Sequence, residues 1–206
     1  MSHKSYLSVY AKSFSWAGYF LPKETLKKCS ALYDFCRVVD NIADDDGEIE
    51  SKKKKFDQFE NDFNQKKFDD PIIKNMWGLI EEFKISLKIV QDLLVGVKSD
   101  IKDKVKLNSK KDLLIYSYRV AGTVGLMMAK ILKVNKKSSL NSAIDLGIAM
   151  QLTNISRDVV EDSKNNRFYI DENFEKIKST IYLADTFYKN SFYSIKDIPI
   201  SFRFSI

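Results

Sequence analysis

The apolar and polar residues of this chain follow a helical period along most of its length. Apolar positions recur three and four residues apart, and the polar breaks between such runs predict where helices begin and end. The first predicted helix covers residues 3–20. A second begins at Pro22, whose backbone angle suits a first helical turn, and ends near residue 45. A polar break at 69–71 separates the next two helical segments.

The helical pattern continues in the second half of the chain. Ser109 and Asp112 resemble a capping box, which opens a helix that reaches about residue 132. An isolated glycine inside a helix costs up to about 1 kcal/mol. Gly122 and Gly125 in this helix therefore serve a purpose: they loosen the helix and let backbone approach a substrate, or they allow close packing of a neighbouring helix.

A further helix is predicted from Ser138 or Ser139 to about residue 162, followed by a turn at 163–167 and a weaker helix to about residue 196. Pro199 begins a last amphipathic segment, which ends with the chain after about two turns. We therefore expect a single domain over residues 1–206 that lacks its last C-terminal helices. A naturally short final helix is the alternative.

The composition agrees with a helical globular protein. Hydrophobic residues make up 44% of the 206 residues and charged residues 30%, and the 7 glycines and 3 prolines are too few for an all-β fold with many tight turns. No run approaches the roughly 20 uncharged apolar residues of a membrane span, and the N-terminus lacks the apolar core of a signal peptide. We expect an all-α protein in the cytoplasm.

The net charge of +6 is compatible with an anionic partner such as nucleic acid, a membrane surface or a phosphorylated substrate. The densest basic run, at residues 52–55, precedes Phe56, Phe59 and Phe63 at helical spacing. We interpret it as the solvated start of an amphipathic helix. Because no recognisable nucleic-acid motif accompanies the lysines, no nucleic-acid partner is expected.

Two acidic pairs with the same spacing lie far apart in the chain. At about 100° per residue, each pair extends into a polar stripe, within an arc of roughly 60° on one helix and roughly 80° on the other. The two stripes are Tyr33, Arg37, Asp40 and Asp44, and Gln151, Asn154, Asp158 and Asp162. Apolar residues cover much of the rest of both helices, which is typical of helices inside a bundle. We therefore expect both stripes to line one interior cavity.

An alternative is that these acids are ordinary exposed helix residues. Two interior stripes argue against it, because carboxylates about 6 Å apart repel by about 3 kcal/mol at an effective dielectric constant of about 20, and burial adds to that cost. Arg37, Arg157 or metal ions could neutralise them. Carboxylate and amide oxygens with no nearby histidine or cysteine are the ligands that Mg²⁺ prefers.

Several other chemistries are disfavoured. His3 is the only histidine and lies in a terminal segment, which nearly excludes histidine catalysis. The chain has no Walker A loop and no GxGxxG turn. An EF-hand around Gly47 fails because its first ligand position would be Ile42 and its last Lys53. What remains is a site that binds a diphosphate through metal and holds an apolar tail.

Four ordered segments carry a family resemblance: SFSWAGYFLP at 13–22, ALYDFCRVVDNIADD at 31–45, YRVAGTVG at 118–125 and QLTNISRDVVEDSKNNRFYI at 151–170. Together they resemble the squalene/phytoene synthase family, the head-to-head trans-prenyltransferases. The last segment is similar above all to the bacterial phytoene synthase form.

The resemblance implies an all-α isoprenoid-synthase helical bundle around a central cavity. It implies metal ligands, Mg²⁺ with Mn²⁺ as the alternative ion, at Asp40, Asp44, Asn154, Asp158 and Asp162. Diphosphate binding or orientation of the metal ligands would involve Tyr33, Arg37, Gln151 and Arg157. The donor site would border Tyr10 and Ser13, and the diphosphate end would be closed by Arg167 and Tyr169.

The implied reaction joins two geranylgeranyl diphosphates through a cyclopropyl diphosphate to give phytoene, without NADPH. A squalene-type synthase acting on farnesyl diphosphate is the alternative within this class, and a non-catalytic helical scaffold of the same fold is the alternative outside it. Four aromatic residues are candidates for stabilising the cation or lining the cavity, with an ordinary core role as the alternative: Phe14, Tyr33, Tyr116 and Tyr118. Because the product is apolar, peripheral contact of the basic surface with anionic lipid is also expected. The oligomeric state stays open.

Overall fold

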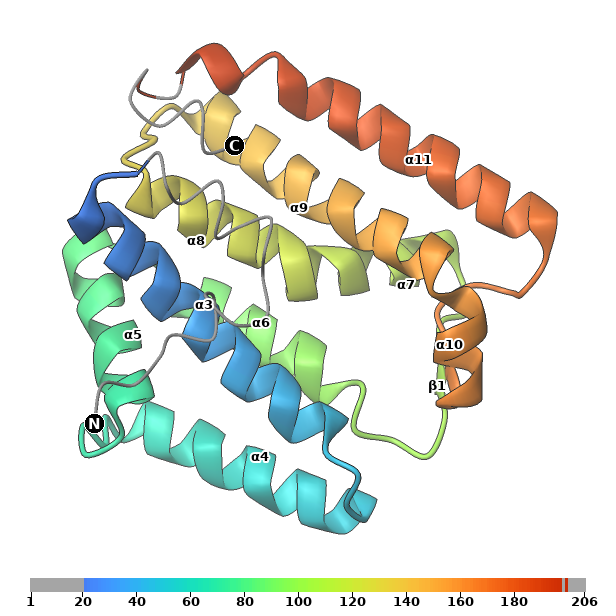
Figure 1. Ribbon diagram of the computed structural model, residues 1–206, viewed down its shortest axis with the longest axis horizontal. Helices are drawn as coiled ribbons and strands as arrows, with labels where there is room; N and C mark the ends of the chain where they lie inside the picture. The colour runs from blue at the N-terminus through green and yellow to red at the C-terminus, as the bar shows by residue number, and fades with distance from the viewer. Residues whose placement is uncertain (1–20, 198, 200–206) are drawn as a thin grey trace.

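The computed structural model describes residues 21–197 and residue 199, and within them the chain is a bundle of helices (Figure 1). The predicted helix at 3–20 and the segment after Pro199 lie outside the described residues. The helices are α3 (Lys23–Asp44), α4 (Ile49–Asn64), α5 (Pro71–Phe83), α6 (Leu87–Lys98), α7 (Lys110–Ser117), α8 (Thr123–Ile131), α9 (Lys137–Arg157), α10 (Val159–Lys164) and α11 (Phe174–Phe192). Shorter elements are β1 (Val105–Lys106), the π-helical segment η1 (Tyr118–Gly122), β2 (Arg167–Phe168) and the 3₁₀ turn η2 (Ile195–Asp197).

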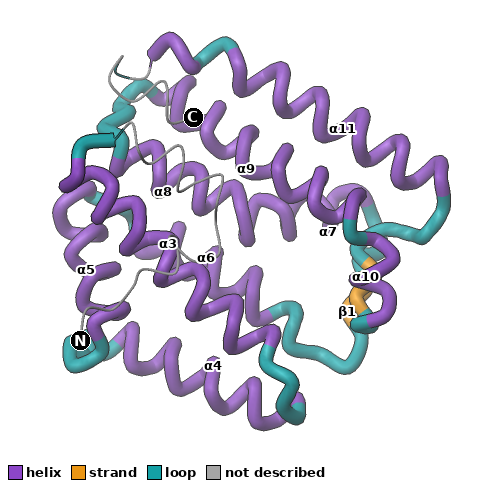
Figure 2. Tube along the Cα trace, in the orientation of Figure 1, coloured by secondary structure: helices purple, strands orange, loops and turns teal. Residues whose placement is uncertain are grey.

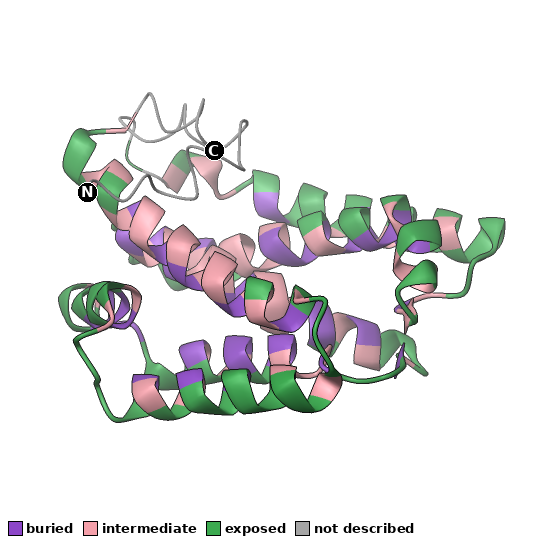
Figure 3. Ribbon diagram, turned by 60° about the horizontal axis from the view of Figure 1, so that its bottom comes forward, coloured by how far each residue is buried: buried purple, intermediate pink, exposed green. Residues whose placement is uncertain are grey.

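The larger of two apolar cores lies between α3, α4, α5, α6 and α8. The expected amphipathic helix is present, since α4 buries Phe56, Phe59 and Phe63 while three of the four lysines before them are exposed. The Phe63 ring lies 5.4 Å from Trp77, whose indole nitrogen donates a 2.9 Å hydrogen bond to the Phe63 carbonyl. Apolar burial along one face of each helix therefore assembles this half of the bundle (Figure 3).

The second core joins α7 and α9 to the segment around β1 and β2, and α11 lies along α9 (Figure 1). Two helix starts agree with the sequence. Asp70 accepts a 2.7 Å hydrogen bond from the Ile72 amide, and Ser109 accepts a 3.1 Å bond from the Asp112 amide, so each caps the helix that follows. None of the described helices combines the length and the apolar content that a membrane crossing requires.

The predicted helix at 109–132 is continuous but contains the π-helical segment η1 at its middle. The glycine stretch also packs closely: a Cβ added at Gly125 would lie 2.2 Å from the carbonyl oxygen of Ala143 on α9. The helix is thus both loosened and tightly packed, and only the absence of a side chain permits the close approach of α8 to α9.

The predicted unbroken helix at 138–162 is wrong, because α9 ends at Arg157 and α10 begins at Val159. Asp158 leaves the helical conformation (φ −101°, ψ 11°), and the Arg157 guanidinium holds its carboxylate. Hydrogen bonds from the Asp158 amide to Asn154 (2.9 Å) and from the Asp162 amide to Asp158 (2.8 Å) still carry the chain across the break.

A short strand pair follows the predicted turn at 163–167, and the sequence did not indicate it. Asn166 has a left-handed backbone (φ 56°), after which β2 pairs in parallel with β1, at one end of the bundle beside α10 (Figure 2). Strands of two residues are too short to show a period of two in the sequence. The pairing connects the segment after α6 to the segment after α10.

Candidate functional site

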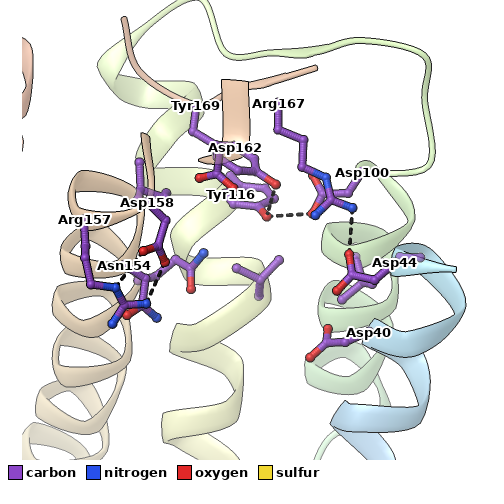
Figure 4. Close-up of a pocket in the computed structure, with 15 residues that line it drawn as sticks. Asp40, Asp44, Asp100, Tyr116, Asn154, Arg157, Asp158, Asp162, Arg167 and Tyr169 are labelled. Carbon is purple, nitrogen blue, oxygen red and sulfur yellow. Dashed lines mark hydrogen bonds and ion pairs between the residues drawn. The ribbon is translucent and has the colours of Figure 1, made fainter. Parts of the chain in front are cut away.

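A polar cavity of about 250 Å³ lies between α3, the end of α6, α7 and the α9–α10 junction (Figure 4). Carboxylate, amide, guanidinium and phenol groups dominate its wall. The lining residues are Asp40, Ala43, Asp44, Val97, Asp100, Tyr116, Val120, Gln151, Asn154, Ile155, Arg157, Asp158, Asp162, Arg167 and Tyr169.

The two predicted acidic stripes meet at this cavity. Asp40 and Asp44 reach it from α3, one turn apart. Opposite them, α9 and α10 contribute Gln151, Asn154, Asp158 and Asp162. The bend at Asp158 does not remove any of these side chains from the wall, since the backbone hydrogen bonds continue across it.

Two acids of the cavity, Asp40 and Asp162, lie in surroundings that disfavour their ionised form. Burial, and then the nearby Asp44 carboxylate, raise the pKa of Asp40 to about 6. Burial is also the main reason that the pKa of Asp162 rises to about 6. Ionised carboxylates in such surroundings are stabilised by a cation, and the structure supplies part of it through arginines.

Arg167 reaches Asp44 across the cavity. Its guanidinium donates a 2.7 Å hydrogen bond to Asp44 Oδ1, and the Arg167 side chain is 22% exposed whereas that of Asp44 is 53% exposed. Burial opposes the charged form of Arg167, but the bond to Asp44 and the field of nearby acids outweigh it and raise the arginine pKa. The residue expected to close over a diphosphate therefore bridges two segments 123 positions apart.

Arg157 forms a different kind of pair. It donates two hydrogen bonds to the carboxylate of its neighbour Asp158, at 2.7 and 2.6 Å, and two thirds of its side chain is exposed. The bond from Arg157 lowers the pKa of Asp158. This guanidinium lies at the mouth of the cavity, where a phosphate could replace the carboxylate as its partner.

Asp100, which was not predicted as a site residue, follows α6 in a loop rich in charged residues. Tyr116 Oη donates a 2.7 Å hydrogen bond to Asp100 Oδ2, and the Tyr116 and Tyr169 hydroxyl oxygens are 3.0 Å apart. Burial raises the pKa of Asp100 to about 6 and those of Tyr116 and Tyr169 above the usual tyrosine range. No repeated spacing marks Asp100, so only the fold reveals it. Tyr116 was a candidate for lining the cavity, and Tyr169 was expected at its diphosphate end. Both line the cavity.

The remaining predicted residues lie elsewhere. Tyr33 and Arg37 are half-buried on α3, but neither is among the described residues that line the cavity. At a rise of about 1.5 Å per residue, Tyr33 is about 16 Å along the helix from Asp44, so the stripe extends beyond the cavity. Tyr10 and Ser13 lie outside the described residues.

The donor groups fit a hard divalent cation such as Mg²⁺, because all are carboxylate or amide oxygens. Among the described residues, no three histidine, cysteine, aspartate or glutamate side chains form a ready metal cage. Mg²⁺ commonly uses one or two carboxylates and completes its octahedron with water and phosphate oxygens. Asp40 with Asp44 on one side, and Asp158, Asp162 and Asn154 on the other, could each supply such a partial set.

Solved structures share this architecture. A dehydrosqualene synthase superposes with a TM-score of 0.75 at 26% identity, over 95% of this chain and 76% of that one. The squalene synthase of Alicyclobacillus acidocaldarius superposes with a TM-score of 0.79 at 18% identity, over 97% of this chain and 83% of that one. A helical bundle that carries two acid-bearing helices across one cavity is thus the fold of an isoprenoid synthase.

Sequence comparison identifies the family of this chain within that class. The family model described as squalene/phytoene synthase matches residues 7–174, and the chain belongs to this family. The phytoene synthase of Rhodobacter capsulatus is 33% identical over 180 residues, which are 84% of this chain and 53% of that protein. The 15-cis-phytoene synthase of Enterobacter agglomerans is 32% identical over 175 residues, 80% of this chain and 59% of that protein. The chain thus spans little more than half the length of these relatives.

Proposed function

We propose that this chain carries the metal and diphosphate site of a head-to-head prenyl synthase that converts two geranylgeranyl diphosphates into phytoene. The observation that carries the proposal is the convergence of Asp40 and Asp44 with Asn154, Asp158 and Asp162 on one cavity. The family membership, together with relatives named phytoene synthase at 31–34% identity, supports the reaction type and the C20 substrate.

In the first half-reaction the C–O bond of one substrate breaks and diphosphate leaves with the electron pair. The double bond of the second substrate attacks the resulting allylic cation, and loss of a proton closes a cyclopropyl diphosphate. Bound Mg²⁺ would draw charge from the leaving diphosphate. Departure of the second diphosphate, rearrangement and loss of a second proton then give phytoene, so no reductant is consumed.

The residues of this chain would act through position and charge. Asp40, Asp44, Asp158 and Asp162, with Asn154, would hold the cations, while Arg167 and Arg157 provide guanidinium groups at the cavity for phosphate oxygens. Apolar side chains of Val97, Val120 and Ile155 border the polar wall and are where the allylic part of a substrate would lie. A site that is acidic at one end and apolar beside it separates the diphosphate from the carbocation.

A farnesyl-using synthase is the second candidate, and the similarity to a dehydrosqualene synthase structure favours it. The decisive experiment is incubation of the protein with each diphosphate and Mg²⁺, with and without NADPH, followed by chromatography of the hydrocarbon. A C40 product made without NADPH is expected. A C30 product would overturn the choice of substrate.

A non-catalytic scaffold is the candidate from another class. The acids and arginines of the cavity argue against it. The partly buried Asp40 carboxylate destabilises the fold, and a scaffold that binds no metal would gain nothing from it. Mg²⁺-dependent binding of a prenyl thiodiphosphate, an analogue that ionises poorly, separates the two. No binding, with the protein folded by circular dichroism, would support the scaffold.

We further propose a cytoplasmic protein that touches anionic membrane through its basic surface, because the hydrocarbon product partitions into lipid. Co-sedimentation with vesicles that contain an acidic phospholipid should exceed that with neutral vesicles and fall as salt is added. Equal recovery with both kinds of vesicle would count against it.

A further inference from the structure

Asp100, Tyr116 and Tyr169 form a hydrogen-bonded group in the cavity wall, called here the tyrosine cluster (Figure 4). Its members come from three separate segments: the loop after α6, the helix α7, and the residue after β2. The Tyr116 and Tyr169 rings stack with centroids 4.7 Å apart and an interplanar angle of 23°. Stacking and hydrogen bonding together leave these side chains little freedom to rotate.

Asp100 holds the cluster with one carboxylate oxygen. Its Oδ2 accepts the 2.7 Å bond from Tyr116, whereas Oδ1 is buried and has no hydrogen-bond partner among the described residues. A carboxylate with an unsatisfied buried oxygen costs stability, so its presence calls for a reason beyond packing.

The cluster adjoins Arg167 along the chain. Arg167, in β2, and Tyr169, just after β2, both line the cavity. The pairing of β1 with β2 fixes this segment, through hydrogen bonds from the Val105 amide to Asn166 (2.9 Å) and from the Leu107 amide to Phe168 (3.2 Å). The Tyr116 hydroxyl lies 3.0 Å from the Tyr169 hydroxyl. Tyr169 is two residues after Arg167, whose guanidinium binds Asp44.

We propose that Asp100 is a positioning residue, which acts through Tyr116 and Tyr169 to hold Arg167 across the cavity from α3, at the diphosphate end of the site. The placement of that end rests on the proposed function. Asp100 keeps the tyrosines in one arrangement, and the tyrosines with the strand pair keep Arg167 within reach of Asp44 and of an incoming phosphate. Asp100 Oδ1 is left without a partner because the side chain is placed to hold Tyr116 and, through it, Arg167.

The test combines two measurements on Asp100→Asn, with Asp103→Asn as the matched control. Asp103 is an exposed acid in the same loop, three residues further on, so its replacement removes an equal charge without touching the cluster. Asparagine keeps the shape of Asp100 and an acceptor oxygen but loses the charge that strengthens the bond from Tyr116. Tyr169→Phe removes the next link and should act in the same direction.

The first measurement is Mg²⁺-dependent binding of a prenyl thiodiphosphate in a double-mutant cycle. Asp100→Asn should raise Kd about tenfold, the typical effect of weakening a bond to a charged group. In an Arg167→Gln background the same change should alter Kd by less than about twofold, because the residue through which Asp100 acts is gone. Equal effects of Asp100→Asn in both backgrounds would overturn the proposal, since a residue that only supports the fold acts independently of Arg167.

The second measurement needs no ligand. Hydrogen exchange of peptides that cover residues 103–109 and 165–170 should become faster in Asp100→Asn and stay unchanged in Asp103→Asn, because the Val105 and Leu107 amides depend on the strand pair. Unchanged exchange in Asp100→Asn would also overturn the proposal. If the unmodified protein fails to bind the analogue, the proposed function falls, and the exchange measurement still decides the role of Asp100.

Discussion

The two sides of the cavity carry the same spacing of aspartates but neutralise them differently. On α3, Asp40 is half-buried and Asp44 receives its cation from Arg167, which is 123 positions away in the chain. At the α9–α10 junction, Asp158 receives its cation from Arg157, the residue immediately before it. The first arrangement depends on the folded protein, and the second is available to almost any local conformation.

This difference teaches that a repeated motif does not imply two equivalent sites. On the α3 side, burial and the neighbouring Asp44 disfavour the ionised form of Asp40. A bound cation should therefore increase the stability of the folded protein strongly through this residue. At the junction, Asp158 is already paired with Arg157, so this acid should respond less to a cation.

Replacement of Asp40 by alanine should abolish Mg²⁺-dependent binding of a prenyl thiodiphosphate. The loss should exceed the roughly 10–100-fold effect of changes beyond the direct ligands, because a buried ligand is removed. Isothermal titration is the measurement, and Asp46→Ala, an exposed acid after α3, is the control. Asp158→Ala should weaken binding less, and a reversed order of the two variants would contradict the contrast.

Mg²⁺ together with inorganic diphosphate should stabilise the protein against thermal unfolding. At ligand concentrations about 100 times Kd, the expected gain is about 2.7 kcal/mol, and chelation by EDTA should reverse it. The gain should disappear in Asp40→Ala and persist in part in Asp158→Ala. Identical gains in both variants would mean that the ions do not distinguish the two sides.

Arg167→Gln should destabilise the metal-free protein by about 1–2 kcal/mol, because it leaves acids in the cavity without their cation. Arg157→Gln should cost at most about 1 kcal/mol, since its pair with Asp158 is exposed and local. Urea unfolding of both variants at low salt measures the difference. If Arg157→Gln were the more damaging change, the local pair would carry more energy than its exposure allows.

The metal-free protein should lose stability as the pH rises from about 4 through about 6. The folded pKa of Asp40 lies at about 6, above its unfolded value of about 4, so the folded state binds more protons between the two. The loss attributable to Asp40 should be about 2–3 kcal/mol and should be absent in Asp40→Asn.

Asp158, at the junction, should show the opposite sign. Because the pKa of Asp158 is lowered, its stabilising contribution is present at neutral pH and disappears as the pH falls through about 4 and below. Thermal unfolding of Asp158→Asn across the same pH range should therefore lack a loss at low pH that the unmodified protein shows. Parallel curves for the Asp40→Asn and Asp158→Asn variants would contradict the different environments of the two pairs.

Much of the fold could be predicted because its signals are local. The capping residues Asp70 and Ser109 and the phenylalanines of α4 lie within a few positions of the elements they define. The isoprenoid-synthase fold and the family followed from four segments of the sequence, and the comparisons confirm both. The helix break at Asp158 escaped prediction, since it depends on a local contact that the apolar period does not reveal.

The candidate site was predictable only in part. The stripes on α3 and α9 were visible as helical arcs, and their side chains do reach one cavity, whereas Tyr33 and Arg37 lie beyond its wall because an arc does not say where a cavity ends. Asp100 gave no signal at all. A single acid in a charged loop becomes part of a site only when another segment lies against it.

Four properties follow from the order of residues alone: which faces of the helices are apolar, which faces carry acids, where several helices begin and which family the chain resembles. Each of these properties depends on residues a few positions apart, whose relative placement a helix sets at once. Only the tertiary structure decided that Arg167 meets Asp44, that β1 pairs with β2, and that Asp100 holds Tyr116. These contacts join segments far apart in the chain, or on different elements, and they form only when burial of the two cores closes the intervening loops.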